Sequence, residues 1–149
     1  MKTGVIRIAL CLGLTIGLAS AVSAQRDAED PEREEYIRSH YTKTEHRIPM
    51  RDGVTLFTAV YVPNDTSEPH PILLLRTPYS VGPYGADQHK KRLGPTSDFE
   101  RDGYIFVFQD VRGRFMSEGE FVNMRPHNPA KNGAEDIDES TDTYDTIDW

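Results

Sequence analysis

Residues 72–79 read ILLLRTPY, an apolar run that stops abruptly at a Pro-Tyr corner. A continuous apolar run such as residues 72–75 is typical of a β-strand that is covered on both faces. A second such run, YIFVF, follows at residues 104–108. A strand, a crossover and another strand make a βαβ unit, in which the two strands lie parallel. The sequence therefore predicts an α/β fold, whose first parallel strand ends at the corner.

The crossover between the two runs contains one helix signal. Ser97 and Glu100 have the spacing of a capping box, and Gly103 suits the end of a helix. We expect a short helix at this place, with Ser97 and Glu100 closing its first turn.

A hairpin signal precedes the first run. Asp52-Gly53 separates two extended stretches, residues 42–50 and 54–63, and this dipeptide favours a tight turn between antiparallel strands. The hairpin would lie at the edge of a larger sheet. Alternate residues of its second strand would face opposite sides: Val54, Leu56, Thr58, Val60 and Val62 on one, and Thr55, Phe57, Ala59 and Tyr61 on the other.

Residues 133–149 are predicted to be helical. Ile137, Thr141, Tyr144 and Ile147 or Asp148 fall on one stripe at helical spacing, as in an amphipathic helix. Acidic residues crowd the first turns, where the helix dipole favours them. We expect the acidic run 135–148 to be a solvated face of this helix.

The first 24 residues have the features of a secretory signal. Lys2 and Arg7 precede an apolar run, and Val22-Ser23-Ala24 supplies the small residues of a cleavage site. We expect cleavage after Ala24, a secreted or periplasmic mature protein, and no membrane attachment afterwards. The only cysteine, Cys11, would leave with the signal, so the mature chain would have no disulfide.

Residues 25–41 are charged and show no apolar periodicity, so we expect an N-terminal arm or a frayed helix that could hold a homo-oligomer together. The whole chain has a net charge of −7. Loss of two basic residues and no acid with the signal would make this −9, and such a surface repels phosphate backbones. Nucleic acid is therefore not an expected partner.

Several kinds of site are missing from the sequence. Ser80, Ser97, Ser117 and Ser140 all lack the Gly-x-Ser-x-Gly frame of a hydrolase nucleophile. Residues 136–147 resemble a calcium loop only in their acids, because Thr141 and Ile147 replace the required Gly and Glu. The five histidines have no metal-ligand spacing. We expect neither a metal nor an organic cofactor.

The hairpin and the two apolar runs together resemble a known family. Four stretches carry the resemblance: RIPMRDGVTLFTAVYVP, LLLRTPY, RDGYIFVFQDVRGRFMSEGEF and DESTDTYDTIDW. They look like the start of the catalytic domain of the cocaine esterase / X-Pro dipeptidyl-peptidase serine hydrolases. Within that family they are most similar to α-amino-acid ester hydrolases and glutaryl-cephalosporin acylases. The resemblance covers residues 42–149, and the string from Asp110 to Gly119 is its most specific part.

This resemblance implies the first part of an α/β-hydrolase domain, which ends before the nucleophile elbow. The serine, in a G-x-S-Y-x-G elbow, would follow Trp149, and the triad Asp and His would lie further on. The strand at 104–108 would then form an exposed edge of the incomplete sheet, and the chain alone would be inactive. The implied reaction is cleavage of a small ester or amide through an acyl-enzyme. An X-Pro dipeptidyl-peptidase acting on peptides and a non-catalytic secreted binding module are the alternatives.

Tyr79 is the one catalytic residue that the resemblance places in this chain. In the family, the tyrosine of the motif matched by residues 76–79 donates its hydroxyl to the oxyanion hole. A phenol can donate to a developing alkoxide, and Pro78 restricts the backbone that aims it. A tyrosine that merely caps the sheet is the structural alternative, and Tyr84 is the rival residue. Asp110 and Arg112 are expected to form a buried structural ion pair that holds the following loop.

Overall fold

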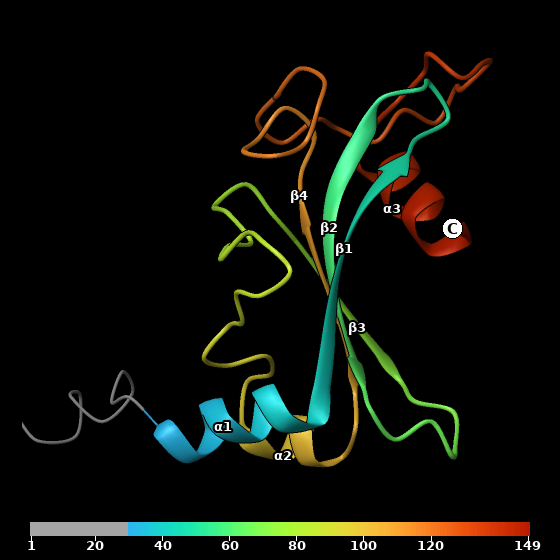
Figure 1. Ribbon diagram of the computed structural model, residues 1–149. Coiled ribbons are helices and arrows are strands. Elements are labelled where there is room, and N and C mark those ends of the chain that lie inside the picture. Colours follow the sequence, from blue (N-terminus) through green and yellow to red (C-terminus); the bar gives the residue numbers. More distant parts are fainter. Residues whose placement is uncertain (1–29) are drawn as a thin grey trace, which may run out of the picture.

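The computed structural model describes residues 30–149, which form one four-stranded sheet and three helices (Figure 1). The elements follow in the order α1 (Pro31–His40), β1 (Tyr41–Pro49), β2 (Thr55–Pro63), β3 (Ile72–Thr77), α2 (Ser97–Arg101), β4 (Ile105–Asp110) and α3 (Glu139–Asp148). The signal expected at residues 1–24 lies outside the described residues.

The sheet has the strand order β1-β2-β4-β3. β1 and β2 form the predicted antiparallel hairpin, whose turn places Gly53 at a φ of +85°. β3 and β4 are parallel, as predicted, and β4 also pairs antiparallel with β2. The α/β class is therefore confirmed.

The expected positions of the two parallel strands in the sheet were wrong. β4 has a partner on each side, so residues 104–108 do not form a free edge. β3 is the edge strand instead, and 63% of Ile72 and 53% of Leu75 are exposed, so this run is not covered on both faces. An apolar run reports how hydrophobic a strand is, but it does not report which neighbours the strand will have.

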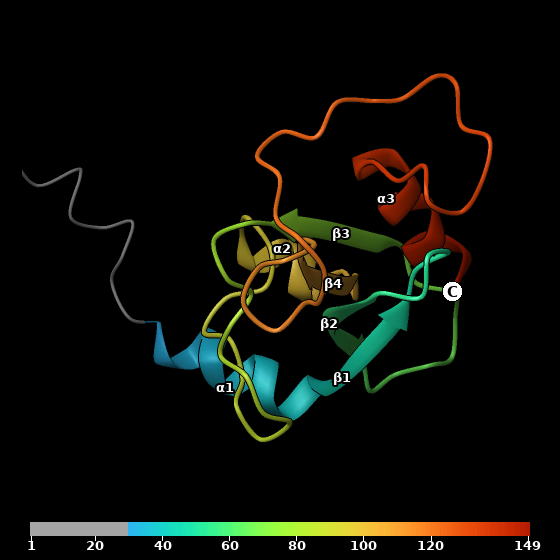
Figure 2. The ribbon, with the colours of Figure 1, turned by 90° about the horizontal axis from the view of Figure 1, so that it is seen from above.

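One face of the sheet is covered by α1 and by the segment between β3 and α2 (Figures 1 and 2). Ile37 of α1 and Val81 and Leu93 of that segment are buried there. They pack with inward side chains of the sheet: Tyr41, Phe57, Ala59, Tyr61, Phe106 and Phe108. Residues 31–40 of the expected arm thus form a helix that packs on its own chain, through one fully buried apolar residue.

The capping box expected for α2 is not formed. The N-cap is Thr96, whose side chain makes no capping bond. Glu100 is buried and turns away, so that its Oε1 accepts hydrogen bonds from the backbone N–H groups of Leu93 and Gly94 and from Nη2 of Arg33. This carboxylate therefore joins α1 to the crossover, because it finds three donors there, one of them a cation.

α3 lies on the opposite face of the sheet (Figure 1). It begins at Glu139, so residues 133–138 are not helical, and of the expected stripe only Thr141 is buried within the helix. Its buried residues are Thr141, Asp142 and Thr146, whereas 63% of Tyr144 and 71% of Ile147 are exposed. The reason lies beneath the helix, where the buried amide of Gln109 donates to the hydroxyl oxygens of Thr58 and Thr146. Polar groups of the sheet therefore draw polar groups of the helix inward.

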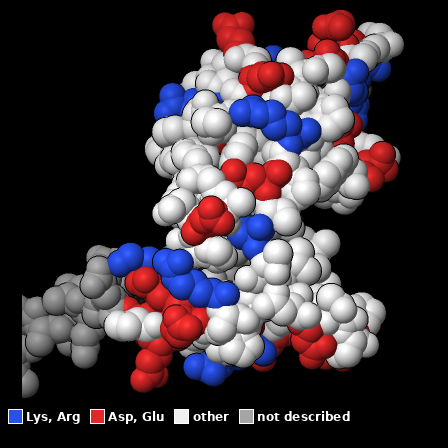
Figure 3. All heavy atoms as spheres, viewed as in Figure 1, with Lys and Arg blue, Asp and Glu red and all other residues white. Residues whose placement is uncertain are grey.

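Charges of both signs are interspersed over the face seen in Figure 3, where blue and red side chains alternate without a continuous basic stripe. Within residues 30–149, no helix is long and apolar enough to cross a membrane.

Candidate active-site corner

The corner after β3 lies beside the end of β4. The parallel register pairs Thr77 with Asp110, so both strands end at the same edge of the sheet. The segments that follow them lie on the same side of the molecule (Figure 1). They are in contact, since Nε of Arg114 donates to the carbonyl oxygen of Pro78 at 3.1 Å. In open α/β sheets this edge is the usual place for a ligand.

Tyr79 occupies the tip of this corner. Its backbone N–H donates to Oγ1 of Thr77 at 3.1 Å, which closes a tight turn, and 85% of the residue is exposed. The next residue, Ser80, has a φ of +78°, in the left-handed region that a residue with a Cβ seldom adopts. The turn directs the chain away from the strand and leaves the Tyr79 side chain exposed to solvent.

Asp110 anchors the segment that follows Tyr79. The residue is fully buried, and its Oδ1 accepts from the N–H of Val81 at 3.0 Å. Its Oδ2 accepts from the hydroxyl of Tyr84 at 2.9 Å and from the N–H of Met116 at 3.3 Å. The expected ion pair between Asp110 and Arg112 was wrong. β4 ends at Asp110, so Arg112 lies in the loop beyond the strand, where it binds Asp52 and Asp142 instead.

Tyr84, the rival tyrosine, is partly buried and is held at the base of the corner. Its hydroxyl lies 2.9 Å from Oγ of Ser80 and 2.9 Å from Oδ2 of Asp110. Its ring packs edge-on against Phe57, with the ring centres 5.2 Å apart. Burial, together with the neighbouring Asp110 carboxylate, raises the pKa of Tyr84. The hydroxyl therefore stays protonated and can donate to the carboxylate.

Arg112 is buried between two carboxylates. Nη1 and Nη2 donate to Asp52 in the hairpin turn at 2.7 and 3.2 Å, and Nε and Nη2 donate to Asp142 in α3 at 3.1 and 2.7 Å. Burial alone would lower the pKa of the Arg112 guanidinium, but the hydrogen bonds to Asp142 and Asp52 outweigh burial and raise this pKa. This single side chain joins the hairpin, the loop after β4 and α3.

The loop after β4 is fastened to β2 as well. Oγ of Ser117 donates to the carbonyl oxygen of Asp110 at 2.6 Å and accepts from the N–H of Phe57 at 2.8 Å. The carboxylate of Glu118 accepts from the N–H of Thr55 at 2.9 Å, and this backbone hydrogen bond lowers the pKa of Glu118. Hydrogen bonds to β2 thus fix the course of the loop.

Gly113 lets the loop fold back on itself. Its φ is +69°, and a Cβ built there would overlap the backbone nitrogen of Phe121 and lie 2.6 Å from the carbonyl carbon of Glu120. No residue with a side chain fits this position without moving the backbone.

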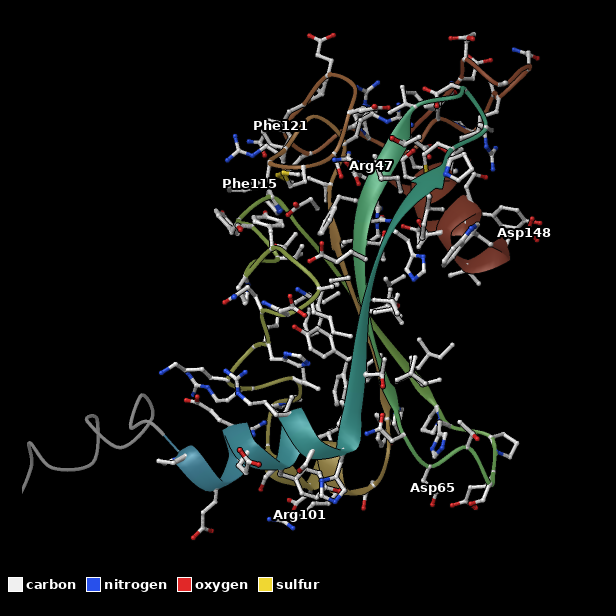
Figure 4. The ribbon with its side chains drawn as sticks, in the orientation of Figure 1. Arg47, Asp65, Arg101, Phe115, Phe121 and Asp148 are labelled. Carbon is white, nitrogen blue, oxygen red and sulfur yellow. The ribbon has the colours of Figure 1, made fainter. Side chains whose placement is uncertain are left out.

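The loop presents an aromatic surface next to the corner. Phe115 and Phe121 project from it on the same side of the molecule (Figure 4). The guanidinium of Arg114 lies 5.1 Å from the centre of the first ring and 5.0 Å from that of the second. Since Arg114 also binds Pro78, the two rings belong to the surroundings of Tyr79.

The sequence located the corner but not the contacts that hold it. It did not predict that Ser80, Tyr84 and Asp110 lie together, or that Asp52 and Asp142 share Arg112. One signal was available, because parallel strands of known register would bring Asp110 to the corner. Within residues 30–149, no group of three or more metal-ligating side chains gathers.

Comparisons of sequence and of structure both match this chain to related hydrolytic enzymes. Residues 52–149 match the model of the X-Pro dipeptidyl-peptidase (S15) family. The cocaine esterase of Rhodococcus sp. (strain MB1 Bresler) is 40% identical over 102 residues, which are 68% of this chain and 15% of the esterase.

Solved structures that share the fold of this chain include two hydrolytic enzymes. An α-amino acid ester hydrolase, labelled with selenomethionine, is 38% identical with a TM-score of 0.57, and an aminopeptidase from the marine sediment archaeon Thaumarchaeota archaeon is 37% identical with a TM-score of 0.55. Each match covers 74% of this chain and 18% of the neighbour, so the chain spans under a fifth of the length of these relatives. The chain belongs to the X-Pro dipeptidyl-peptidase (S15) family.

Proposed function

We propose that this chain is the first part of a serine hydrolase that cleaves small esters or amides through an acyl-enzyme. One observation carries the proposal: Tyr79 is exposed on a fixed corner at the carboxyl end of a parallel strand. Support comes from the relatives, which include proteins named a cocaine esterase and an α-amino acid ester hydrolase.

In the proposed mechanism, a serine beyond Trp149 attacks the substrate carbonyl carbon while a histidine takes the serine proton. The carbonyl oxygen becomes an alkoxide, which accepts a hydrogen bond from the phenolic hydroxyl of Tyr79. Collapse of this intermediate expels the alcohol or amine, which takes the proton from the histidine and leaves an acyl-enzyme. Water, deprotonated by the histidine, then attacks the acyl-enzyme, and the serine leaves with that proton as the acid product is released. Tyr79 accelerates both halves, because its hydrogen bond is strongest when the oxygen carries charge.

A peptidase is the second candidate within this mechanism. The matched family is described as X-Pro dipeptidyl-peptidase, and one structural neighbour is an aminopeptidase. The corner would serve an amide as well as an ester, since both pass through the same oxyanion.

The test uses the whole protein and three substrates: an activated aryl ester, an α-amino-acid ester and an X-Pro anilide. We expect turnover of at least one of them, and loss of activity when one equivalent of a fluorophosphonate labels a single serine. The preferred substrate separates the esterase from the peptidase. A folded whole protein with no turnover and no labelling would instead support the binding module. Residues 25–149 alone are the matched control and should be inactive, because they contain no nucleophile elbow.

We also propose that the protein is exported and that its mature chain begins at Gln25. The basis is the small-residue site at residues 22–24 after an apolar run. N-terminal sequencing of protein from the periplasm or the medium should read QRDAED. Recovery of a chain that starts at Met1 from the cytosol would contradict this prediction.

A further inference from the structure

The hydroxyl of Tyr84 closes a small network directly behind Tyr79. It bridges Oγ of Ser80 and Oδ2 of Asp110, each at 2.9 Å. Ser80 is the residue after Tyr79, and its Oγ also accepts from the N–H of Gly82 at 3.2 Å. The other carboxylate oxygen of Asp110 holds the N–H of Val81. The three residues that follow Tyr79 are therefore all tied, directly or in one step, to Tyr84 and Asp110.

This network holds a backbone conformation that is unfavourable by itself. Ser80 has a φ of +78°, and a residue with a Cβ remains in that region only where its surroundings enforce it. The hydrogen bonds of its side chain are the enforcing contacts. Relaxation of Ser80 to a common φ would rotate the peptide that joins it to Tyr79, and the phenol would move with it.

The remainder of the loop is fixed independently of Tyr84. Nζ of the buried Lys43 donates to the carbonyl oxygens of Pro83, Gly85 and Gln88, each at 2.8 Å. Nζ of Lys90 donates to the carbonyl oxygen of Gly82 at 2.7 Å. Loss of one hydroxyl would therefore leave the loop in place and release only the contact with Ser80 and Asp110.

We propose that the Tyr84 hydroxyl is a positioning group that fixes the direction of the Tyr79 hydroxyl through Ser80 and Asp110. The inference rests on the proposed function, in which Tyr79 is the oxyanion donor. A donor that can swing away must be brought back for each turnover, so a fixed turn behind it favours kcat. The ground-state substrate uses this donor little, so KM should be nearly insensitive to the network.

The test is a double-mutant cycle in the whole enzyme. Tyr84→Phe keeps the ring against Phe57 and removes only the hydroxyl; we expect kcat to fall about tenfold with KM within about twofold. In a Tyr79→Phe background the same change should lower kcat by less than about twofold, because no donor remains to be aimed. Tyr36→Phe, in α1 at the other end of the sheet, is the matched control and should leave kcat unchanged.

Each other outcome overturns the inference in a recognisable way. If Tyr79→Phe lowers kcat but Tyr84→Phe does not, the positioning role alone is wrong. If the two losses multiply and the melting temperature falls equally in both backgrounds, Tyr84 only stabilises the fold. If Tyr79→Phe leaves kcat unchanged, both this inference and the proposed role of Tyr79 fail. Should Tyr84→Phe not fold, Ser80→Ala, which removes the other partner of the hydroxyl, is put through the same cycle.

Discussion

Tyr79→Phe in the whole enzyme is expected to lower kcat by about 10²–10³, equivalent to about 2.7–4 kcal/mol of transition-state stabilisation. The change keeps the ring and the turn that Pro78 and Thr77 form, and it deletes only the donor. KM should move little, because the bond to the substrate oxygen reaches its full strength only when that oxygen carries charge. Steady-state kinetics with the best ester substrate measure both constants.

The control for this experiment must not touch the corner. Tyr84→Phe is unsuitable, although the bare sequence suggests it, because the Tyr84 hydroxyl binds Asp110 and Ser80. Tyr36→Phe serves instead, since this ring stacks on His40 in α1, at the end of the sheet opposite the corner (Figure 1). If a normally folded Tyr79→Phe enzyme keeps kcat within about threefold, well under 1 kcal/mol, the phenol is not the oxyanion donor. The corner would then have a structural role.

Arg112→Met is expected to destabilise the protein by about 3–5 kcal/mol, because it leaves two buried carboxylates without their shared cation. The side chains of Asp52 and Asp142 are 8% and 3% exposed, so water cannot replace the guanidinium. Arg76 offers only partial compensation, since its Nη2 lies 3.6 Å from Asp142. Urea unfolding of the whole protein, followed by tryptophan fluorescence and circular dichroism, measures the loss.

Two variants make this second experiment specific. Arg112→Lys keeps the charge but offers three donors on one nitrogen in place of a planar fork, so it cannot reproduce two hydrogen bonds to each carboxylate and should be of intermediate stability. Arg51→Met removes the more exposed pair with Asp145 and should have a much smaller effect. An Arg112→Met protein as stable as Arg51→Met would show that the buried network contributes nothing beyond packing.

Local patterns of the sequence predicted the parts of the fold that depend on neighbours in the chain. Asp52-Gly53 gave the hairpin, and strict alternation gave the two faces of β2 correctly. The apolar runs gave β3 and β4 and their parallel pairing. The family motif located Tyr79 at the strand end, where the structure also has it. Its role in catalysis stays a prediction.

The features of the fold that the sequence did not predict depend on contacts between groups that are far apart in the chain. The strand order needed the antiparallel pairing of β4 with β2, which no local signal encodes. The stripe of α3 was predicted from apolar spacing, but the buried Gln109 and Arg112 beneath the helix select Thr146 and Asp142. Glu100 does not cap α2 for the same reason, because its carboxylate binds Arg33 and the N–H of Leu93 instead. Buried polar groups overrule patterns that count only hydrophobicity.

Gly113 has a consequence for how mutations at the site would be tolerated. Its backbone is left-handed and its missing side chain makes room for residues 120–121, so both local conformation and tertiary contact forbid a replacement. Gly53 shares the left-handed backbone but has nothing within 4 Å of a would-be Cβ, so Asn or Asp should be accepted there. A saturation library selected for folded protein should therefore return glycine alone at 113 and a short polar set at 53. Gly53 therefore meets a demand of backbone conformation alone, whereas Gly113 also meets a demand of space that no other residue can satisfy.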